Sequence, residues 1–170
     1  ASALNVTDRV VFTRCKASLH AGVLWLEAGS SAHIHRDVDV SENQVLYSDA
    51  GAIMLDGDPP SHLYIGHHVR FERNSANSQN GKGGAIVVQA KSTLQVSDTV
   101  VFVDNSANRG GAVAGVGSGL TLTFESGVTF SRNAALNKGG AIYIFGVASE
   151  DDTPVCEATT ATDAVLPTFL

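Results

Sequence analysis

The sequence predicts an all-β fold: a right-handed single-stranded parallel β-helix of about five coils, with three short strands in each coil. One phrase recurs five times along the chain, apolar and polar residues alternate within each copy, and the segments between strands are too short for crossover helices. Each copy contains an anchor residue that ends an apolar run, and successive anchors lie 28, 31, 31 and 28 residues apart. The anchors are Phe12, Val40, Phe71, Phe102 and Phe130. Such a period, built from short alternating strands, indicates coils that stack on one another.

The first two strands of each copy end at the anchor. In the fourth copy Leu94, Val96 and Val100 precede Phe102, and the other copies carry apolar residues at the same offsets. Spacings of two residues predict strands that turn one face toward the core. A three-residue polar corner, residues 97–99 in this copy, joins the two strands.

The third strand of each copy follows a block of small residues. The third copy reads Gly83-Gly84-Ala85-Ile86-Val87-Val88, and the fourth and sixth positions of this block are apolar in every copy except at Gly115. We therefore expect Ile86 and Val88 to point inward and Val87 to point outward.

Asparagine and paired glycines recur at fixed places and predict scaffold features rather than a site. An asparagine follows the anchor by three residues in four copies, at Asn43, Asn74, Asn105 and Asn133, and Cys15 takes its place in the first copy. Asparagine tolerates left-handed backbone at a bend, and amides stacked on successive coils can bond to one another as a ladder. Paired glycines adopt conformations closed to other residues and allow backbone to pass close beneath a corner.

Length and charge limit the organisation and the partners. The 170 residues suit a β-helix over residues 1–145, followed by a cap or linker over residues 146–170. The formal net charge of −6 argues against nucleic acid as a partner, and no stripe of Lys and Arg is apparent. The chain has no apolar run long enough to span a membrane. Because it opens directly on the first strand, with Leu4 expected to point inward, we expect a processed product or a fragment of a longer protein.

Two further features concern covalent chemistry. Cys15 and Cys156 can form a disulfide only if the C-terminal residues run back along the stack, so their pairing stays open. The sequon Asn5-Val6-Thr7 places Asn5 on the outer face of the first strand, where glycosylation is possible in a secreted eukaryotic protein.

The histidines and acids do not predict a catalytic or metal site. Five histidines fall in the second and third copies, but they spread over two corners and a strand, so a solvated corner is the favoured interpretation over metal binding. They are His33, His35, His62, His67 and His68. The candidate acids of a polysaccharide-cleaving enzyme have no basic partner apparent in the sequence. They are Asp37, Asp39, Asp56, Asp58, Asp98 and Asp104. We expect no enzyme activity and no cofactor.

One apolar column is the predicted partner-binding surface. The outward positions of the third strands are Trp25, Met54, Val87, Ala114 and Tyr143. An exposed apolar stripe with aromatic ends is typical of a protein-binding surface. The alternative is that a loop or the C-terminal residues cover it.

The motifs resemble those of a known family. Phe71-Glu-Arg-Asn74, Phe102-Val-Asp-Asn105 and Phe130-Ser-Arg-Asn133, each followed by Gly-Gly-Ala-Ile or Gly-Gly-Ala-Val, are similar to the paired FxxN and GGA(I/L/V) repeats of the chlamydial polymorphic outer membrane proteins. The first two copies depart from both motifs, at Cys15 and Val40 and at Ala21 and Ala50. The resemblance implies an extracellular passenger of an autotransporter that acts in adhesion to host cells.

Three classes of function remain open at this stage. An adhesin would present its loops, such as residues 56–61 and 75–82, to a host receptor or a glycan. A structural subunit of an extracellular filament or surface coat, suggested by similar repeats in large surface proteins of algae and protists, would use its ends or the apolar column against neighbouring subunits. A polysaccharide lyase or hydrolase would need a cleft over one sheet. All three place the chain outside the cell or on its surface.

Overall fold

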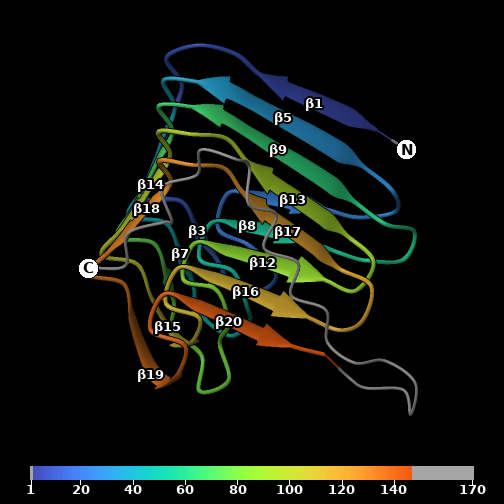
Figure 1. The fold of residues 1–170 in the computed structure, drawn as a ribbon. Coiled ribbons are helices and arrows are strands. Elements are labelled where there is room, and N and C mark those ends of the chain that lie inside the picture. The colour runs from blue at the N-terminus through green and yellow to red at the C-terminus, as the bar shows by residue number, and fades with distance from the viewer. Residues whose placement is uncertain (1, 147–170) are drawn as a thin grey trace.

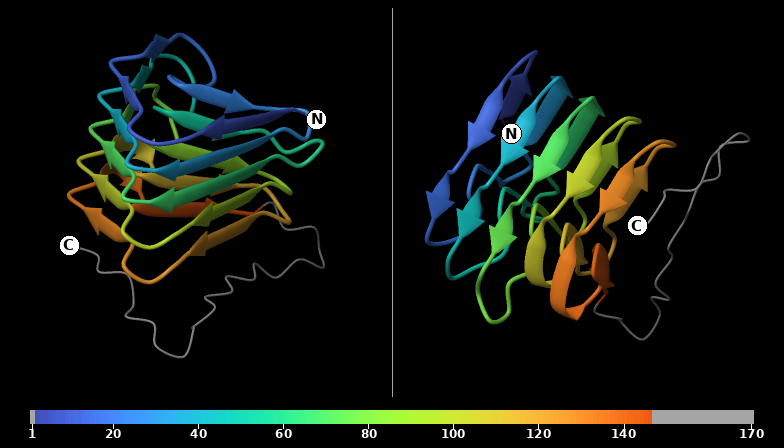
Figure 2. Two further views of the ribbon diagram at one scale, coloured as in Figure 1. Left: turned by 90° about the horizontal axis from the view of Figure 1, so that it is seen from above. Right: turned by 90° about the vertical axis from the view of Figure 1, so that its left-hand side faces the viewer.

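The computed structural model describes residues 2–146, which form a parallel β-helix of five coils (Figure 1). Each coil contributes one strand to each of four parallel sheets, and the described residues contain no helix. Figure 2 shows the coils as stacked rungs, with the first coil at one end of the stack and the fifth at the other. The predicted fold class is confirmed.

The four sheets, here A to D in chain order, take their strands as follows. Sheet A contains β1 (Ala3–Val6), β5 (Ser31–Arg36), β9 (His62–His67), β13 (Thr93–Val96) and β17 (Thr121–Phe124). Sheet B contains β2 (Val11–Thr13), β6 (Asp39–Ser41), β10 (Arg70–Glu72), β14 (Val101–Val103) and β18 (Thr129–Ser131). Sheet C contains β3 (Lys16–Ala17), β7 (Gln44–Val45), β11 (Ser75–Ala76), β15 (Ser106–Arg109) and β19 (Ala134–Lys138). Sheet D contains β4 (Leu24–Leu26), β8 (Ile53–Leu55), β12 (Ile86–Gln89), β16 (Val113–Val116) and β20 (Ile142–Phe145).

Sheet C is the difference from the sequence-based prediction, because each coil has four strands rather than three. Its strands follow the asparagine and are only two residues long in the first three coils. Their buried side chains Val45, Ala76 and Ala107 form a small apolar cluster separate from the main core. A strand of two residues is too short to show an alternating pattern in a sequence.

The main core is built from inward side chains that stack in register. Phe71 and Phe102 lie parallel with ring centroids 4.9 Å apart, and Phe102 and Phe130 follow at 4.8 Å. These separations match the spacing of about 4.8 Å between strands of a sheet, so each ring lies directly over the next. Ile86 and Val88 are fully buried, which confirms the predicted inward positions of the third strand.

The asparagine ladder is present and saturates its amides. Asn105 Oδ1 accepts hydrogen bonds from Asn74 Nδ2 and from the Asn74 backbone N–H, each at 3.0 Å. Asn105 Nδ2 donates to Phe71 O and to Asn133 Oδ1, each at 2.9 Å. Asn74 repeats this pattern, and Cys15 lies at the first position, where its N–H donates to Asn43 Oδ1. A fully paired buried amide stabilises its corner, whereas an unpaired one is costly.

The left-handed residue at this bend is not the asparagine but the residue directly before it. That position has φ between 51° and 57° in all five coils. It is occupied by Arg14, Glu42, Arg73, Asp104 and Arg132. The asparagine side chain therefore satisfies backbone groups beside a left-handed residue rather than adopting that conformation itself.

The two glycines of the small-residue block have different roles. The first is left-handed, with φ of 63° at Gly110 and at Gly139. The second passes close beneath the next coil, because a Cβ on Gly111 would lie 2.1 Å from the carbonyl oxygen of Gly140. Both predicted roles of the paired glycines are present, one at each position.

The last strand among the described residues, β20, ends at Phe145, and the predicted end of the β-helix at residue 145 stays a prediction. Apart from Gly146, the cap or linker predicted for residues 146–170 lies outside the described residues, and so does Cys156. Residues 2–146 include no helix that is long and apolar enough to cross a membrane.

Candidate interaction surfaces

The apolar column on sheet D is in register but is mostly covered. Trp25 pairs with Met54, which pairs with Val87, and Ala114 pairs with Tyr143. Met54 is 6% exposed and Val87 is fully buried. Ala50, in the connection that leads into the same sheet, joins the buried cluster of Met54, Val87 and Ala114. The chain itself thus covers Met54 and Val87 in the middle of the predicted surface, in line with the alternative that a loop covers it.

The ends of this column remain accessible. Trp25 is 38% exposed and Tyr143 is half-buried. The His20 ring stacks on the Trp25 indole with centroids 3.9 Å apart. Partner binding through Trp25 and Tyr143 therefore stays a prediction.

Further apolar side chains, which the sequence analysis did not single out, lie exposed on the connections between sheets C and D in the first two coils. Tyr47 is 74% exposed, Leu19 is 58% exposed and Leu46 is also exposed. The Tyr47 N–H donates to Ser18 O at 3.1 Å, so the first two connections run side by side and bring Leu19 next to Tyr47. We call Leu19, Leu46, Tyr47 and Trp25 the corner patch. Sequence analysis missed it because these connections differ in length and lack a periodic pattern.

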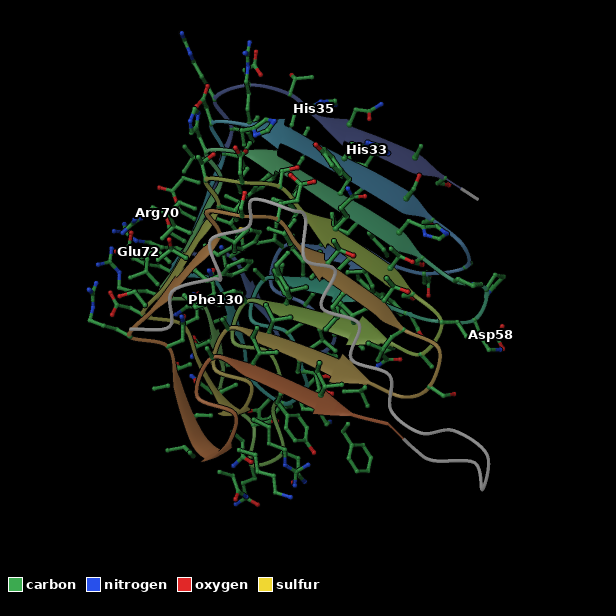
Figure 3. The ribbon with its side chains drawn as sticks, viewed as in Figure 1. His33, His35, Asp58, Arg70, Glu72 and Phe130 are labelled. Carbon is green, nitrogen blue, oxygen red and sulfur yellow. The ribbon has the colours of Figure 1, made fainter. Side chains whose placement is uncertain are left out.

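The outer face of sheet A carries the histidines, as Figure 3 shows for His33 and His35. The His33 and Tyr64 rings lie 5.8 Å apart in neighbouring strands, and Tyr64 Oη is hydrogen-bonded to Ser97 Oγ at 2.9 Å. At the adjoining corner, His67 pairs with Asp98, and His68 Nδ1 lies 3.4 Å from Asp37 Oδ1. The described part of the chain contains no group of three or more His, Cys, Asp or Glu side chains that could hold a metal ion.

Most of the candidate acids do have basic partners, which corrects the sequence-based expectation. Asp104 accepts two hydrogen bonds from Arg132, at 2.8 and 2.9 Å, and Asp58 lies 3.9 Å from Lys91 Nζ. Asp37 and Asp98 pair with the histidines named above. Each pair joins neighbouring coils at a corner, so the acids stay apart instead of gathering over one sheet as a hydrolase would require.

The five left-handed residues described above, from Arg14 to Arg132, form a column whose charge alternates along the stack. Arg14 Nε donates to Glu42 Oε2 at 2.9 Å, and Arg73 Nη2 donates to Glu42 Oε1 at 3.2 Å. The hydrogen bond from Arg14 lowers the pKa of Glu42, and the hydrogen bond from Arg132 lowers the pKa of Asp104. Figure 3 places Arg70 and Glu72 close to this edge of the prism. Because these side chains are exposed, each pair adds little stability, and the alternation chiefly disfavours a slip of one coil against the next.

A second charged column runs along the position directly before the small-residue block. Lys82 pairs in register with Arg109, and Arg109 pairs with Lys138. Asp49 lies beside Lys82 and accepts hydrogen bonds from its N–H at 2.9 Å and its Nζ at 3.0 Å. We call Lys82, Arg109 and Lys138 the cation column. The sequence-based statement that the chain has no stripe of Lys and Arg is therefore wrong for this corner, and aligning the residue before each Gly-Gly pair could have found it.

Two other predicted positions are accessible. Asn5 lies exposed on β1, opposite His33 in β5, and its glycosylation stays a prediction. In the predicted loop over residues 56–61, Asp58, which is labelled in Figure 3, and Pro59 are exposed. The peptide bond between them is cis.

Comparison with known proteins supports the resemblance of the repeats. The Chlamydia polymorphic membrane protein repeat matches residues 127–144. This segment contains Phe130, Asn133 and the block Gly139-Gly140-Ala141-Ile142, so it covers both motifs of the fifth copy. The match and the parallel β-helix together confirm the resemblance to a Pmp-type repeat. No curated protein and no solved structure matches the chain.

Proposed function

We propose that the chain is an extracellular β-helical scaffold that acts in adhesion, with the corner patch as its contact surface. The matched repeat belongs to a family of surface proteins, and a β-helical scaffold fits that location. The inward side chains, the asparagine ladder and the paired glycines all serve the stacking of coils. Binding is therefore expected from side chains that the stack does not use.

The corner patch is the observation that carries this proposal. Leu19, Tyr47 and Trp25 expose large apolar surfaces on adjacent segments of the first two coils. A contiguous apolar patch costs solubility and usually marks an interaction site, and Trp and Tyr are the residues that most often dominate binding energy.

The test compares two sets of exposed substitutions in the 170-residue chain. Leu19→Ser with Tyr47→Ser removes the centre of the patch, whereas Leu136→Ser removes an equally apolar side chain that is 90% exposed in the fifth coil. We expect the double variant to lose at least about tenfold in binding to cultured epithelial cells, which corresponds to about 1.4 kcal/mol, and the Leu136 variant to bind as the original chain does. Circular dichroism confirms the fold of each. Undiminished cell binding by the double variant would contradict the proposal.

A structural subunit is the second candidate. Head-to-tail stacking would place Cys15 of one copy over Asn133 of another. The asparagine donors point toward the following coil, as when Asn105 N–H and Nδ2 both donate to Asn133 Oδ1. Cys15 has no amide oxygen to accept the corresponding hydrogen bonds from Asn133. Light scattering that shows regular polymers would nevertheless favour this candidate over adhesion by single chains.

The acids at the corners do not support the third candidate, a polysaccharide-cleaving enzyme. Four of the six candidate acids, namely Asp37, Asp58, Asp98 and Asp104, are engaged with basic side chains of neighbouring coils, and the matched repeat family is not an enzyme family.

A further inference from the structure

Two of the three charges of the cation column, those of Arg109 and Lys138, are not neutralised by an acid among residues 2–146. Five of the seven arginines form ion pairs with acids, and within residues 2–146 only Arg9 and Arg109 form none. Lys138 is exposed and also has no acidic partner among these residues. Asp49 is the acid of this column, and it is taken by Lys82. Two adjacent positive charges are thus left open in a chain whose formal net charge is −6.

Arg109 is also partly withdrawn from water without compensation. Its Nε is buried and has no hydrogen-bond partner in the described structure, and the neighbouring Asn108 Oδ1 is in the same state. A buried donor without a partner costs free energy, so the Arg109 side chain is held in this place without compensation from within the described chain. Guanidinium groups bind carboxylate and sulfate through bidentate hydrogen bonds.

The direction of the column limits the shape of the ligand. Lys82, Arg109 and Lys138 lie in register on neighbouring strands, about 4.8 Å apart along the axis of the stack. The backbone groups between them are already bonded, since Gly83 N–H donates to Arg109 O at 3.0 Å and Gly110 N–H donates to Lys138 O at 2.9 Å. An extended peptide could gain no main-chain hydrogen bonds at this place. Its acidic side chains on one face would also repeat at about 6.6 Å, which does not match the cations.

We propose that the cation column binds an acidic polysaccharide, whose carboxylate or sulfate groups lie against Arg109 and Lys138. A chain of sugar rings can follow the axis of the stack, and its hydroxyls can bond to the exposed amides of Asn80 in the third coil and Asn137 in the fifth, which precede Lys82 and Lys138. This inference rests on the proposed function and names a class of ligand for a second surface of the scaffold, the cation column.

The test measures binding of the 170-residue chain to four immobilised polyanions: heparin, polygalacturonate, polyglutamate and a single-stranded oligonucleotide. The variant Arg109→Gln with Lys138→Gln removes the open charges of the column. Arg9→Gln with Lys16→Gln is the matched control, because it removes the same charge from residues without an ion pair on the first coil. Thermal unfolding verifies that each variant is folded, and Lys138→Gln alone, at an exposed position, serves if the double variant does not fold.

We expect at least about tenfold weaker binding of the acidic polysaccharides by the column variant, with a smaller salt dependence, and binding close to that of the original chain by the control. Equal binding by the column variant, no binding of either polysaccharide, or equal or tighter binding of polyglutamate or the oligonucleotide would each overturn the proposal. Cell binding is measured in parallel. Adhesion without polysaccharide binding would refute this inference and leave adhesion standing, whereas polysaccharide binding without adhesion would refute adhesion alone.

Discussion

Substitution of Gly111 by alanine is expected to separate the fourth coil from the fifth. A Cβ at this position would lie 2.1 Å from Gly140 O and 2.6 Å from both the nitrogen and the oxygen of Ala134. Ordinary contacts of a Cβ begin near 3.4 Å, so the overlap with Gly140 O is about 1.3 Å. All three atoms belong to the backbone of the next coil, which is bonded to the fourth coil through Gly111 N–H and Gly139 O at 3.1 Å. No rotation of a side chain can relieve the clash.

We expect Gly111→Ala to reduce the free energy of unfolding by about 3 kcal/mol or more, at the upper end of what overpacking costs. That loss is a large share of the roughly 5 to 15 kcal/mol that hold a typical domain together. Urea unfolding followed by far-ultraviolet circular dichroism measures it through the midpoint and slope.

The matched control is Gly140→Ala, at the same motif position one coil later. A Cβ on Gly140 would meet only Asn133 O, at 3.6 Å, because no described coil lies beyond it. We expect this variant to stay within about 0.5 kcal/mol of the original chain. Equal effects of the two substitutions, or a Gly111→Ala variant as stable as the original, would refute the argument that the second glycine serves close approach of the backbone.

Three further predictions concern the ladder and the charged corners. Asn105→Asp keeps the shape of the side chain but places an acceptor oxygen against the acceptors Phe71 O and Asn133 Oδ1. We expect the free energy of unfolding, measured in urea, to fall by about 2 to 4 kcal/mol. The control Asn137→Asp, at an exposed position, should change stability little. Arg132→Gln should raise the pKa of Asp104 toward its ordinary value, as followed by NMR titration of that carboxyl group, and an unchanged pKa would contradict the role of Arg132. Because the folded-state pKa values of Glu42 and Asp104 are lowered, the two carboxylates stabilise the fold above the unfolded pKa near 4, and this stabilisation is lost as the pH falls through the folded values. The urea midpoint should therefore fall in acid. A constant midpoint from neutral pH to about pH 2 would disprove this linkage.

Much of the scaffold could be predicted from the sequence because it repeats. The interval between anchors such as Phe71 and Phe102 equals the length of one coil, and identical side chains one coil apart must stack. The alternation before each anchor assigned the inward residues correctly. Sheet C was not predicted because its strands are too short to show an alternating pattern. The left-handed residue before each asparagine was not predicted because the residues at this position share no common side-chain type.

The candidate surfaces could be predicted only in part. The register of the outward column from Trp25 to Tyr143 was correct, but its exposure could not be predicted, since burial of Val87 depends on how the preceding connection folds over sheet D. The corner patch arises because two connections of different length lie side by side, which a pattern search does not detect. The cation column could have been predicted from the sequence by aligning the residue before each Gly-Gly pair. Which of its charges remain unpaired depends on the acids that lie near them in the folded chain.

The sequence by itself therefore determined the fold class, the number of coils, the inward face of three strands and the resemblance of the repeats, since these depend on distances along the chain and on stacking of like residues. The tertiary structure alone decided which outward side chains are covered, which charges are paired and which remain open. Those properties depend on contacts between residues about 30 positions apart and on irregular connections. Lys82 is neutralised by Asp49, whereas Arg109 has no acidic partner among residues 2–146, and this difference can be seen only when neighbouring coils lie side by side.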